Sequence, residues 1–162
     1  MNIRPITDAD FDQVWPIIRE VVQAQETYAF DPEMDRDTAW RLWVELPTAT
    51  YVAERDGQIL GSYYIKPNAA GPGDHVCNCG YMVAPAARGQ GVAGRLCAHS
   101  LEVARERGFE AMQFNSVVAS NTVAIALWQK HGFRIVGTLP RAYRHRSLGH
   151  VDCHVMYRSL LD

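Results

Sequence analysis

The sequence predicts an α+β fold in a single domain that spans residues 1–162. Several short segments alternate apolar and polar residues, a pattern typical of half-buried strands, while others repeat apolar residues at helical spacing. A turn dipeptide joins two of the alternating segments, so at least part of the sheet is antiparallel. With 48% apolar residues, a chain of this length can bury one core but is too short for two ordinary domains.

The chain begins with a short strand and a helix. Residues 2–6 have strand character, and Thr7-x-x-Asp10 resembles a capping box with Asp in place of Glu or Gln. Apolar residues then recur at helical spacing as far as Val22. Pro16 lies inside this pattern and predicts a kink or an early restart of the helix.

A loop, a second helix and a hairpin follow. Residues 25–34 show no periodicity and predict a loop, whereas residues 36–45 carry two tryptophans on one side of a helix. Residues 50–55 and 58–65 alternate, and Asp56-Gly57 between them is a hairpin turn dipeptide.

The second half of the chain alternates between strands and helices. Gly108 is expected to cap the C-terminus of the helix over residues 92–107. The apolar side of this helix carries Leu96, Leu101, Val103 and Ala104. The expected strands and helices occupy residues 76–83, 92–107, 111–117, 121–131, 134–139 and 151–158.

Composition excludes several classes of partner. A net charge of −2 gives no electrostatic case for binding nucleic acid or an anionic membrane. No apolar run approaches the roughly 20 residues needed to span a bilayer. An acidic helix, not an apolar segment, follows the N-terminus, so we expect no signal peptide and a cytoplasmic protein. The oligomeric state stays open, with a homodimer as one option.

The four cysteines are expected to be buried thiols. His75-x-Cys77-x-Cys79 could begin a metal site, but no second ligand pair at suitable spacing follows it. Cys77 and Cys79 alternate within a strand-like segment, which favours burial. We therefore expect no metal.

A glycine-rich loop joins a strand to a helix in the middle of the chain. Its glycines expose consecutive backbone N–H groups, and a helix N-terminus adds about half a positive charge. Together these features predict a phosphate or pyrophosphate site, in which an arginine is a further partner. The loop consists of Arg88, Gly89, Gln90, Gly91, Val92, Ala93 and Gly94.

A dinucleotide site is a poor explanation of this loop, although Gly89-x-Gly91-x-x-Gly94 matches the fingerprint. That fingerprint follows the first strand of a parallel βαβ unit, whereas this loop lies past the midpoint of the chain. The next strand ends in Asn115-Ser116-Val117 and offers no carboxylate for a ribose. A Walker A loop is excluded because no Gly-Lys-Ser/Thr is present.

Two motifs resemble the signatures of the GNAT superfamily of N-acetyltransferases. Arg88-x-x-Gly91-x-Ala93 is similar to its Arg/Gln-x-x-Gly-x-Gly/Ala loop, which also follows the fourth strand. Asn121-x-x-Ala124-x-x-Leu127-Trp128-x-x-x-Gly132-Phe133 resembles the second signature. The resemblance implies the GNAT fold, a mixed, mostly antiparallel sheet of six to seven strands with about four helices on its faces.

The resemblance also implies acetyl-CoA as the phosphorylated co-substrate. The backbone amides from Gly89 to Gly94 would hold the pyrophosphate, and Val83 would pair with the pantetheine arm as if with an added strand. Asn121 would hydrogen-bond the same arm and also serve as a helix N-cap. The alternative is that the glycines only form a tight turn.

Two departures from the family pattern concern catalysis. Trp128 stands where many GNAT enzymes carry a Tyr that protonates the leaving thiolate, and an indole N–H is no acid at neutral pH. The fourth strand carries Asn78, with Gly80 on the same face, where relatives have a Glu base. The general acid and base are therefore open.

Asn78 and Asn115 lie on neighbouring strands. One interpretation is that they only hold the diverging strands together. The other follows a closer resemblance to the yeast proline-analogue acetyltransferases and their bacterial relatives, where matching asparagines hold a small amino acid. The resemblance lies in Cys77-Asn78-Cys79-Gly80-Tyr81, Phe114-Asn115-x-Val117-x-Ala119-x-Asn121 and His150-Val151-Asp152. It implies that Asn78 and Asn115 bind the amine and carboxylate of the acceptor. Because an amide is no base, water would take the proton or the amine would enter neutral, and catalysis would depend mostly on positioning.

The loop Thr27-Tyr28-Ala29-Phe30 lies between the first two helices, where the GNAT resemblance implies that the enzyme closes over the acceptor, and it also resembles the phosphinothricin-type acetyltransferases. Tyr28 is either a wall of the acceptor site or part of the core. Residues 141–146 are basic and would contact an anion or form a solvated hairpin. His145, His150 and His154 are candidate proton carriers.

These observations predict an acetyl-CoA-dependent N-acetyltransferase that acts on a small amino acid or a proline-like or toxic analogue. A protein N-terminus, a polyamine and an antibiotic amine are alternative acceptors, although the acidic residues are too scattered for a polycation. A non-catalytic acyl-CoA-binding module is the alternative of another class.

Overall fold

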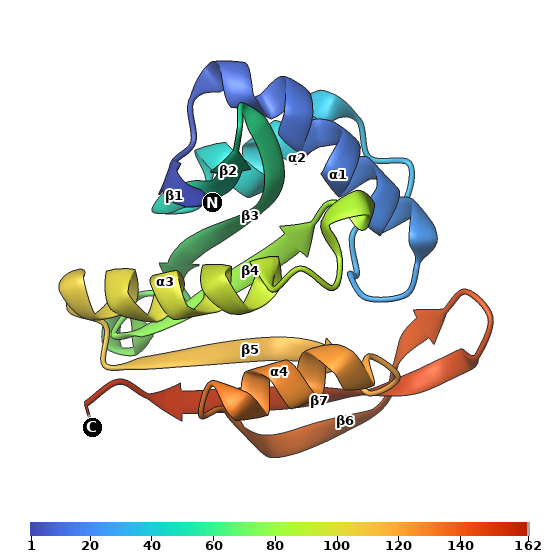
Figure 1. The fold of residues 1–162 in the computed structure, drawn as a ribbon. Helices are drawn as coiled ribbons and strands as arrows, with labels where there is room; N and C mark the ends of the chain where they lie inside the picture. Colours follow the sequence, from blue (N-terminus) through green and yellow to red (C-terminus); the bar gives the residue numbers. More distant parts are fainter. Residues whose placement is uncertain (162) are drawn as a thin grey trace.

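The computed structural model describes residues 1–161, which form one seven-stranded sheet in the order β1-β2-β3-β4-β5-β7-β6 (Figure 1). Every neighbouring pair is antiparallel except β4 and β5, so the predicted mixed sheet is confirmed. The strands are β1 (Asn2–Pro5), β2 (Ala49–Arg55), β3 (Gln58–Pro67), β4 (Val76–Val83), β5 (Ala111–Val118), β6 (Arg134–His145) and β7 (Gly149–Ser159).

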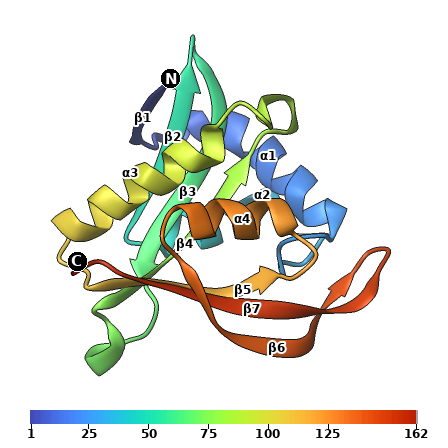
Figure 2. The ribbon, with the colours of Figure 1, turned by 60° about the horizontal axis from the view of Figure 1, so that its bottom comes forward.

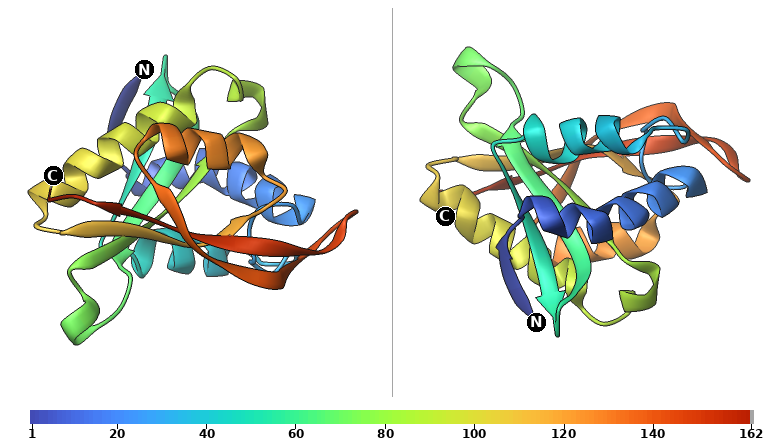
Figure 3. Two further views of the ribbon diagram at one scale, coloured as in Figure 1. Left: turned by 90° about the horizontal axis from the view of Figure 1, so that it is seen from below. Right: turned by 90° about the horizontal axis from the view of Figure 1, so that it is seen from above.

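Helices cover both faces of the sheet (Figures 2 and 3). On one face, α1 and α2 bury Trp43 and the apolar side chains of α1 against β2 and β3. On the other face, α3 and α4 cover the central strands and form a second core. The helices are α1 (Phe11–Ala24), α2 (Arg36–Trp40) with a π-helical continuation (Arg41–Glu45), α3 (Val92–Glu106) and α4 (Thr122–Lys130).

The start of α1 follows the predicted capping interaction. The Asp10 carboxylate accepts hydrogen bonds from the Thr7 N–H (2.7 Å) and hydroxyl (2.9 Å), and a 3-10 turn (Asp8–Asp10) leads into the helix. The predicted restart at Pro16 is wrong. Pro16 is exposed, and the helix continues through it because the buried face on either side holds both halves against the sheet.

The predicted hairpin joins β2 to β3. Asp56 and Gly57 have φ values of 53° and 79°, as a two-residue hairpin turn requires. The predicted inward face of α3 is confirmed, because Leu96, Leu101, Val103 and Ala104 are all buried.

The last hairpin extends beyond the predicted limits. β6 runs to His145 and β7 starts at Gly149, although strand character was expected only for residues 134–139 and 151–158. Nearly every residue of β6 is exposed, so the strand lacks the alternation that would mark its full length. Figure 1 shows this hairpin projecting beyond the rest of the sheet.

All four cysteines are free and buried, as expected. Within residues 1–161, no helix has the length and apolar character needed to cross a membrane.

Candidate active site

The sheet opens between its two parallel strands. β4 and β5 pair only at Val76↔Ala111 and Cys77↔Met112, and beyond these residues β4 rises away from β5 (Figure 1). A cavity of about 730 Å³ lies along the opening. Parallel strands that separate in this way leave backbone groups of both strands without a neighbouring strand, so the opening can pair with an extended ligand.

The N-terminus of α3 lies beside one end of the cavity. Gly89 and Gly91 have φ values of 76° and 77°, which explains why the turn into α3 needs glycine. The Arg95 N–H bonds the Gly91 carbonyl (3.2 Å), so the N–H groups of residues 92–94 precede the helical ladder and face outward. A helix of 15 residues adds the positive end of its dipole at this point.

Not all residues of this loop face the cavity with their side chains. Arg88 and Ala93 line it, together with Val83 at the end of β4. The Val92 side chain is buried in the core, so only its backbone is accessible. The Gln90 amide instead accepts from Arg55 (3.0 Å) and donates to the Ala86 carbonyl (3.0 Å), which holds the loop to β2.

Asn121 lies across the opening from Val83 and begins α4. Its Oδ1 accepts from the Ala124 N–H (3.3 Å), so the expected N-cap is confirmed. Its Nδ2 stays available on the cavity wall. Trp128 lies about two helical turns further along α4. It is buried, and its ring centroid lies 5.0 Å from that of Tyr81 and 5.1 Å from that of Phe114. On this wall of the cavity α4 therefore presents the indole of Trp128, which cannot serve as a general acid as a tyrosine hydroxyl could.

A chain of amide side chains closes the narrow end of the opening. The Asn78 Nδ2 donates to the Gln113 carbonyl (2.9 Å), directly after the last β4–β5 pair. The Gln113 Nε2 donates to the Asn115 Oδ1 (3.0 Å), and the Asn115 Nδ2 donates to the Asn68 Oδ1 (2.7 Å). Asn78 thus connects the diverging strands, and it also lines the cavity with Asn115.

Asn78 is buried and Asn115 is exposed. The Asn78 Oδ1 accepts from the Tyr64 hydroxyl (3.2 Å), and burial raises the pKa of Tyr64 to about 12, so the phenol remains a neutral donor. One N–H and one lone pair of the Asn78 amide have no bond in this network. Asn78 can therefore hold the strands together and still bind a ligand.

Gly80 allows the Tyr64 ring to lie across β4. A Cβ atom at Gly80 would stand 2.6 Å from Tyr64 Cε1, which no side chain could tolerate without movement of the ring. Lys66, two residues along β3 on the same face, pairs in register with Asn78, and its Nζ lies 5.3 Å from the centroid of the Tyr64 ring.

The loop after α1 covers this side of the cavity. The Tyr28 hydroxyl accepts from the Tyr81 N–H (2.7 Å) and donates to the Tyr81 carbonyl (2.9 Å). The Tyr28 ring stacks on Phe30 and meets Trp43 edge-on. Burial, with a smaller contribution from Tyr64, raises the pKa of Tyr28 well above its usual value. Tyr28 is therefore both a cavity wall and part of the packing.

The last hairpin holds this loop in place. The Tyr143 hydroxyl donates to the Tyr28 carbonyl (3.1 Å), and the Arg146 N–H donates to the Gln25 carbonyl (3.0 Å). The loop that lines the cavity is consequently held by a segment that is far away in the sequence.

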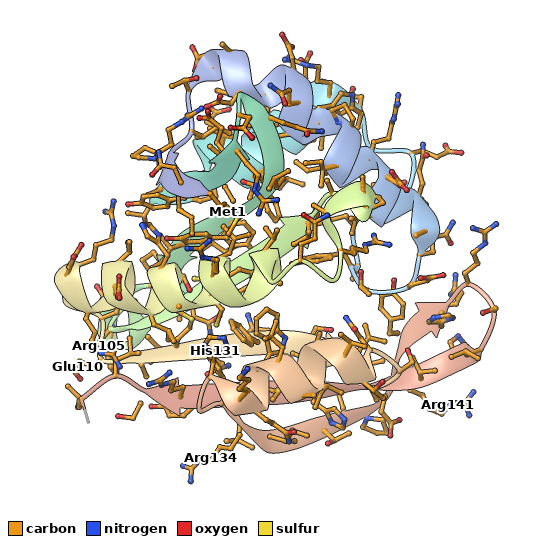
Figure 4. All side chains as sticks on the ribbon, in the orientation of Figure 1. Met1, Arg105, Glu110, His131, Arg134 and Arg141 are labelled. Atoms are coloured by element: carbon orange, nitrogen blue, oxygen red, sulfur yellow. The ribbon has the colours of Figure 1, made fainter. Side chains whose placement is uncertain are left out.

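The other candidates lie outside the cavity. Figure 4 shows Arg141 on the projecting hairpin, where its N–H donates to Asp152 Oδ1 (2.9 Å). Among the residues that line the cavity within the described chain there is no histidine, so the structure does not place His145, His150 or His154 as proton carriers.

Polar residues at this site that were not singled out from the sequence include Glu20, Glu26, Tyr64 and Lys66 in the cavity lining, and Gln113 and Asn68 in the amide network. Gln113 could have been found, because it lies two residues from Asn115 on the same strand face. Lys66 could not, since no residue of its own strand was a candidate. Asn68 could not, since it belongs to a connection whose path the sequence does not define.

The mixed sheet opens between its parallel strands and has a glycine-capped helix N-terminus at one end of the opening, which is the arrangement expected for an acyl-CoA-dependent transferase of the GNAT fold. The acetyltransferase (GNAT) family matches residues 15–133, and the chain belongs to this family. It is thus an acetyl-CoA-dependent N-acetyltransferase. The expected fold, family and co-substrate are confirmed.

Individual relatives support this assignment over nearly the whole chain. A GCN5-related N-acetyltransferase from Kribbella flavida is 46% identical, with a TM-score of 0.93 over 98% of this chain and 96% of that one. A ribosomal-protein-alanine N-acetyltransferase from Brucella melitensis is 27% identical, with a TM-score of 0.88 over 98% and 99%. N-acetyltransferase aca1 of Schizosaccharomyces pombe is 30% identical over 83% of this chain and 72% of its own length.

Proposed function

We propose that the enzyme acetylates the amine of a small amino acid or amino-acid analogue, with proline-like compounds as the first acceptors to test. The observation that carries this proposal is the roof over the acceptor side of the cavity. The loop that holds Tyr28 is hydrogen-bonded both to β4 and to the last hairpin, and this cover favours a small acceptor over an extended peptide.

Acetyl-CoA would occupy the opening between β4 and β5. The N–H groups of residues 92–94 and the Arg88 guanidinium would bind the pyrophosphate. The backbone of Val83 and the Asn121 Nδ2 would hold the pantetheine arm from opposite sides. Gly89 and Gly91 would shape the turn, while Gln90 and Gly94 contribute backbone only.

The acceptor would lie on the α1 side of β4. The free amide groups of Asn78 and Asn115 are suited to an amine and a carboxylate, and Lys66 adds a cation on the same face for the carboxylate. Because an amide is no base, these residues would act by positioning an acceptor that enters as the neutral amine or loses its proton to water.

Release of free thiol measures the acceptor preference directly. We expect azetidine-2-carboxylate and proline to be acetylated at least about tenfold more efficiently than azetidine and pyrrolidine, which lack the carboxylate. A preference for an alanine-terminated peptide would assign the enzyme to protein N-termini, the substrate named for the Brucella melitensis relative. Preference for a polyamine, or no turnover despite tight acetyl-CoA binding, would also overturn the proposal.

Substitution of the two asparagines tests their assignment. Asn78→Ala and Asn115→Ala should each raise the acceptor KM or lower kcat about tenfold or more, and both should leave acetyl-CoA affinity nearly intact. Asn78→Ala should also lower the melting temperature, because it leaves the Gln113 carbonyl without its partner. A parallel loss of acetyl-CoA affinity would show that the acceptor assignment is wrong.

A further inference from the structure

The Tyr28 hydroxyl lies in the opening of the sheet, at backbone groups that would otherwise face β5. It accepts from the Tyr81 N–H at 2.7 Å and donates to the Tyr81 carbonyl at 2.9 Å. Because strand backbone groups alternate between the two edges, Val83 turns its N–H and carbonyl toward the same edge as Tyr81. The hydroxyl therefore stands about 7 Å, two strand residues, deeper in the opening than the backbone of Val83.

In the proposed acetyl-CoA site, the reacting end of the acyl donor would lie at this depth. The argument rests on the proposed acetyl-CoA site, in which Val83 holds the pantetheine arm and the thioester continues inward along β4. The next N–H and carbonyl on this edge of β4 are those of Tyr81, and the Tyr28 hydroxyl is already hydrogen-bonded to both. At this point the Tyr28 hydroxyl is a donor that faces the cavity.

The hydroxyl can change its acceptor without movement of the ring. The ring is fixed by stacking on Phe30 (5.6 Å between centroids) and by Trp43 (6.4 Å), while rotation about the C–O bond turns the proton away from the Tyr81 carbonyl. The bond received from the Tyr81 N–H stays in place during this rotation and strengthens the hydroxyl as a donor.

We propose that the Tyr28 hydroxyl donates a hydrogen bond to the thioester carbonyl oxygen and stabilises the negative charge that develops there as the amine adds. The amine nitrogen forms a bond to the carbonyl carbon, and the C–S bond then breaks with its electron pair on sulfur. The proton lost by the nitrogen reaches sulfur through water, so amine and thioester yield amide and thiol. Tyr28 keeps its own proton throughout.

Proton donation from Tyr28 to the leaving thiolate is the alternative role. Burial raises the pKa of Tyr28 well above its usual value, whereas an alkyl thiol has a pKa of about 8.5. Transfer from the phenol to the thiolate would therefore be uphill. A neutral donor directed at the oxygen is the role that the environment favours.

The infrared spectrum of bound [1-13C]acetyl-CoA tests the hydrogen bond without turnover. In the wild-type enzyme we expect the thioester carbonyl stretch to fall below its frequency in water, and in Tyr28→Phe to return toward that value. Tyr143→Phe loosens the same loop but keeps the phenol of Tyr28, so it should retain the low frequency. Tyr51→Phe, which is remote from the cavity, controls for loss of a tyrosine hydroxyl.

Kinetics supply the second measurement. Tyr28→Phe should lower kcat about 100-fold, while the Kd of acetyl-CoA measured by calorimetry changes less than about threefold. An equal loss of kcat in Tyr143→Phe, or an unchanged carbonyl frequency in Tyr28→Phe, would overturn the proposal. Should Tyr28→Phe fail to fold, a wild-type carbonyl frequency at or above the aqueous value overturns it.

Calorimetry on the wild type separates two kinds of failure. If acetyl-CoA does not bind, both the proposed co-substrate site and the role of Tyr28 are wrong. If it binds and the spectrum shows no hydrogen bond that depends on Tyr28, only the role of Tyr28 is wrong.

Discussion

At the residue scale, single side chains in the opening of the sheet serve structure and ligand binding together. Asn78 bridges the diverging strands through the Gln113 carbonyl and lines the cavity with the rest of its amide. The two interpretations that the sequence left open for this residue are therefore compatible. The same applies to Asn121, which caps α4 with its oxygen and keeps its nitrogen for the cavity.

Gly80→Ala should damage the acceptor side of the site. The new Cβ would stand 2.6 Å from the Tyr64 ring, so the ring must move and its bond to Asn78 (3.2 Å) is lost. We expect about 1–3 kcal/mol of destabilisation and a higher acceptor KM at unchanged acetyl-CoA KM. Gly137→Ala, where nothing lies within 4 Å, is the matched control for steady-state kinetics and thermal melting. Identical behaviour of the two variants would contradict this account.

At the element scale, the positions of helices and strands follow from the sequence far better than the walls of the cavity do. Periodicity and turn residues predicted α3, α4 and the β2–β3 hairpin, because these elements obey local rules. Tyr28 is hydrogen-bonded to Tyr81, which is 53 positions away, and to Tyr143, which is 115 positions away. No local pattern could therefore say whether Tyr28 is a cavity wall or part of the packing. The exposed β6 likewise had no alternation to mark its end.

Gly91→Ala should weaken acetyl-CoA binding through the start of α3. A φ of 77° costs alanine about 1–2 kcal/mol, and relaxation of that strain turns the N–H groups of residues 92–94 away from the cavity. We expect the acetyl-CoA Kd to rise about tenfold by calorimetry. Gly57→Ala carries the same strain (φ 79°) in a turn remote from the cavity. It should cost stability alone, and an equal effect on Kd would refute the prediction.

Asp10→Asn should destabilise the junction of β1 and α1 in a pH-dependent way. Hydrogen bonds from Arg4 (2.7 and 2.9 Å) lower the pKa of Asp10 to about 2. Because this pKa lies below its unfolded value of about 3.9, the stabilisation is present above pH 4 and is lost as the pH falls toward 2.

Denaturant unfolding from pH 2 to 7 measures this difference. Since Arg4 is 30% exposed, we expect a loss of about 1–2 kcal/mol at pH 7 that shrinks below pH 4. Asp12→Asn breaks an ion pair whose side chains are 45% and 81% exposed, and should cost less than about 0.5 kcal/mol. A loss in Asp10→Asn that does not vary with pH would rule out the ionic origin.

At the scale of the whole molecule, the site is complete only when three distant segments meet. β4 supplies the backbone edge, the loop after α1 supplies Tyr28, and the last hairpin holds that loop through Tyr143 and Arg146. Most of β6 is exposed, and these two bonds give the projecting end of the hairpin a direct connection to the acceptor side of the cavity.

Tyr143→Phe tests this connection. The Tyr143 hydroxyl donates to the Tyr28 carbonyl at 3.1 Å, and its loss should cost no more than about 1 kcal/mol of stability. The loop around Tyr28 should then open more often and raise the acceptor KM several-fold. The acetyl-CoA KM should stay unchanged, because the bond between Tyr143 and Tyr28 lies away from the start of α3. Hydrogen exchange should be faster in residues 25–30 and unaltered in α3. If the acetyl-CoA KM rose instead, the hairpin would support the donor side of the cavity, and the division of the site into a fixed donor end and a roofed acceptor end would be wrong.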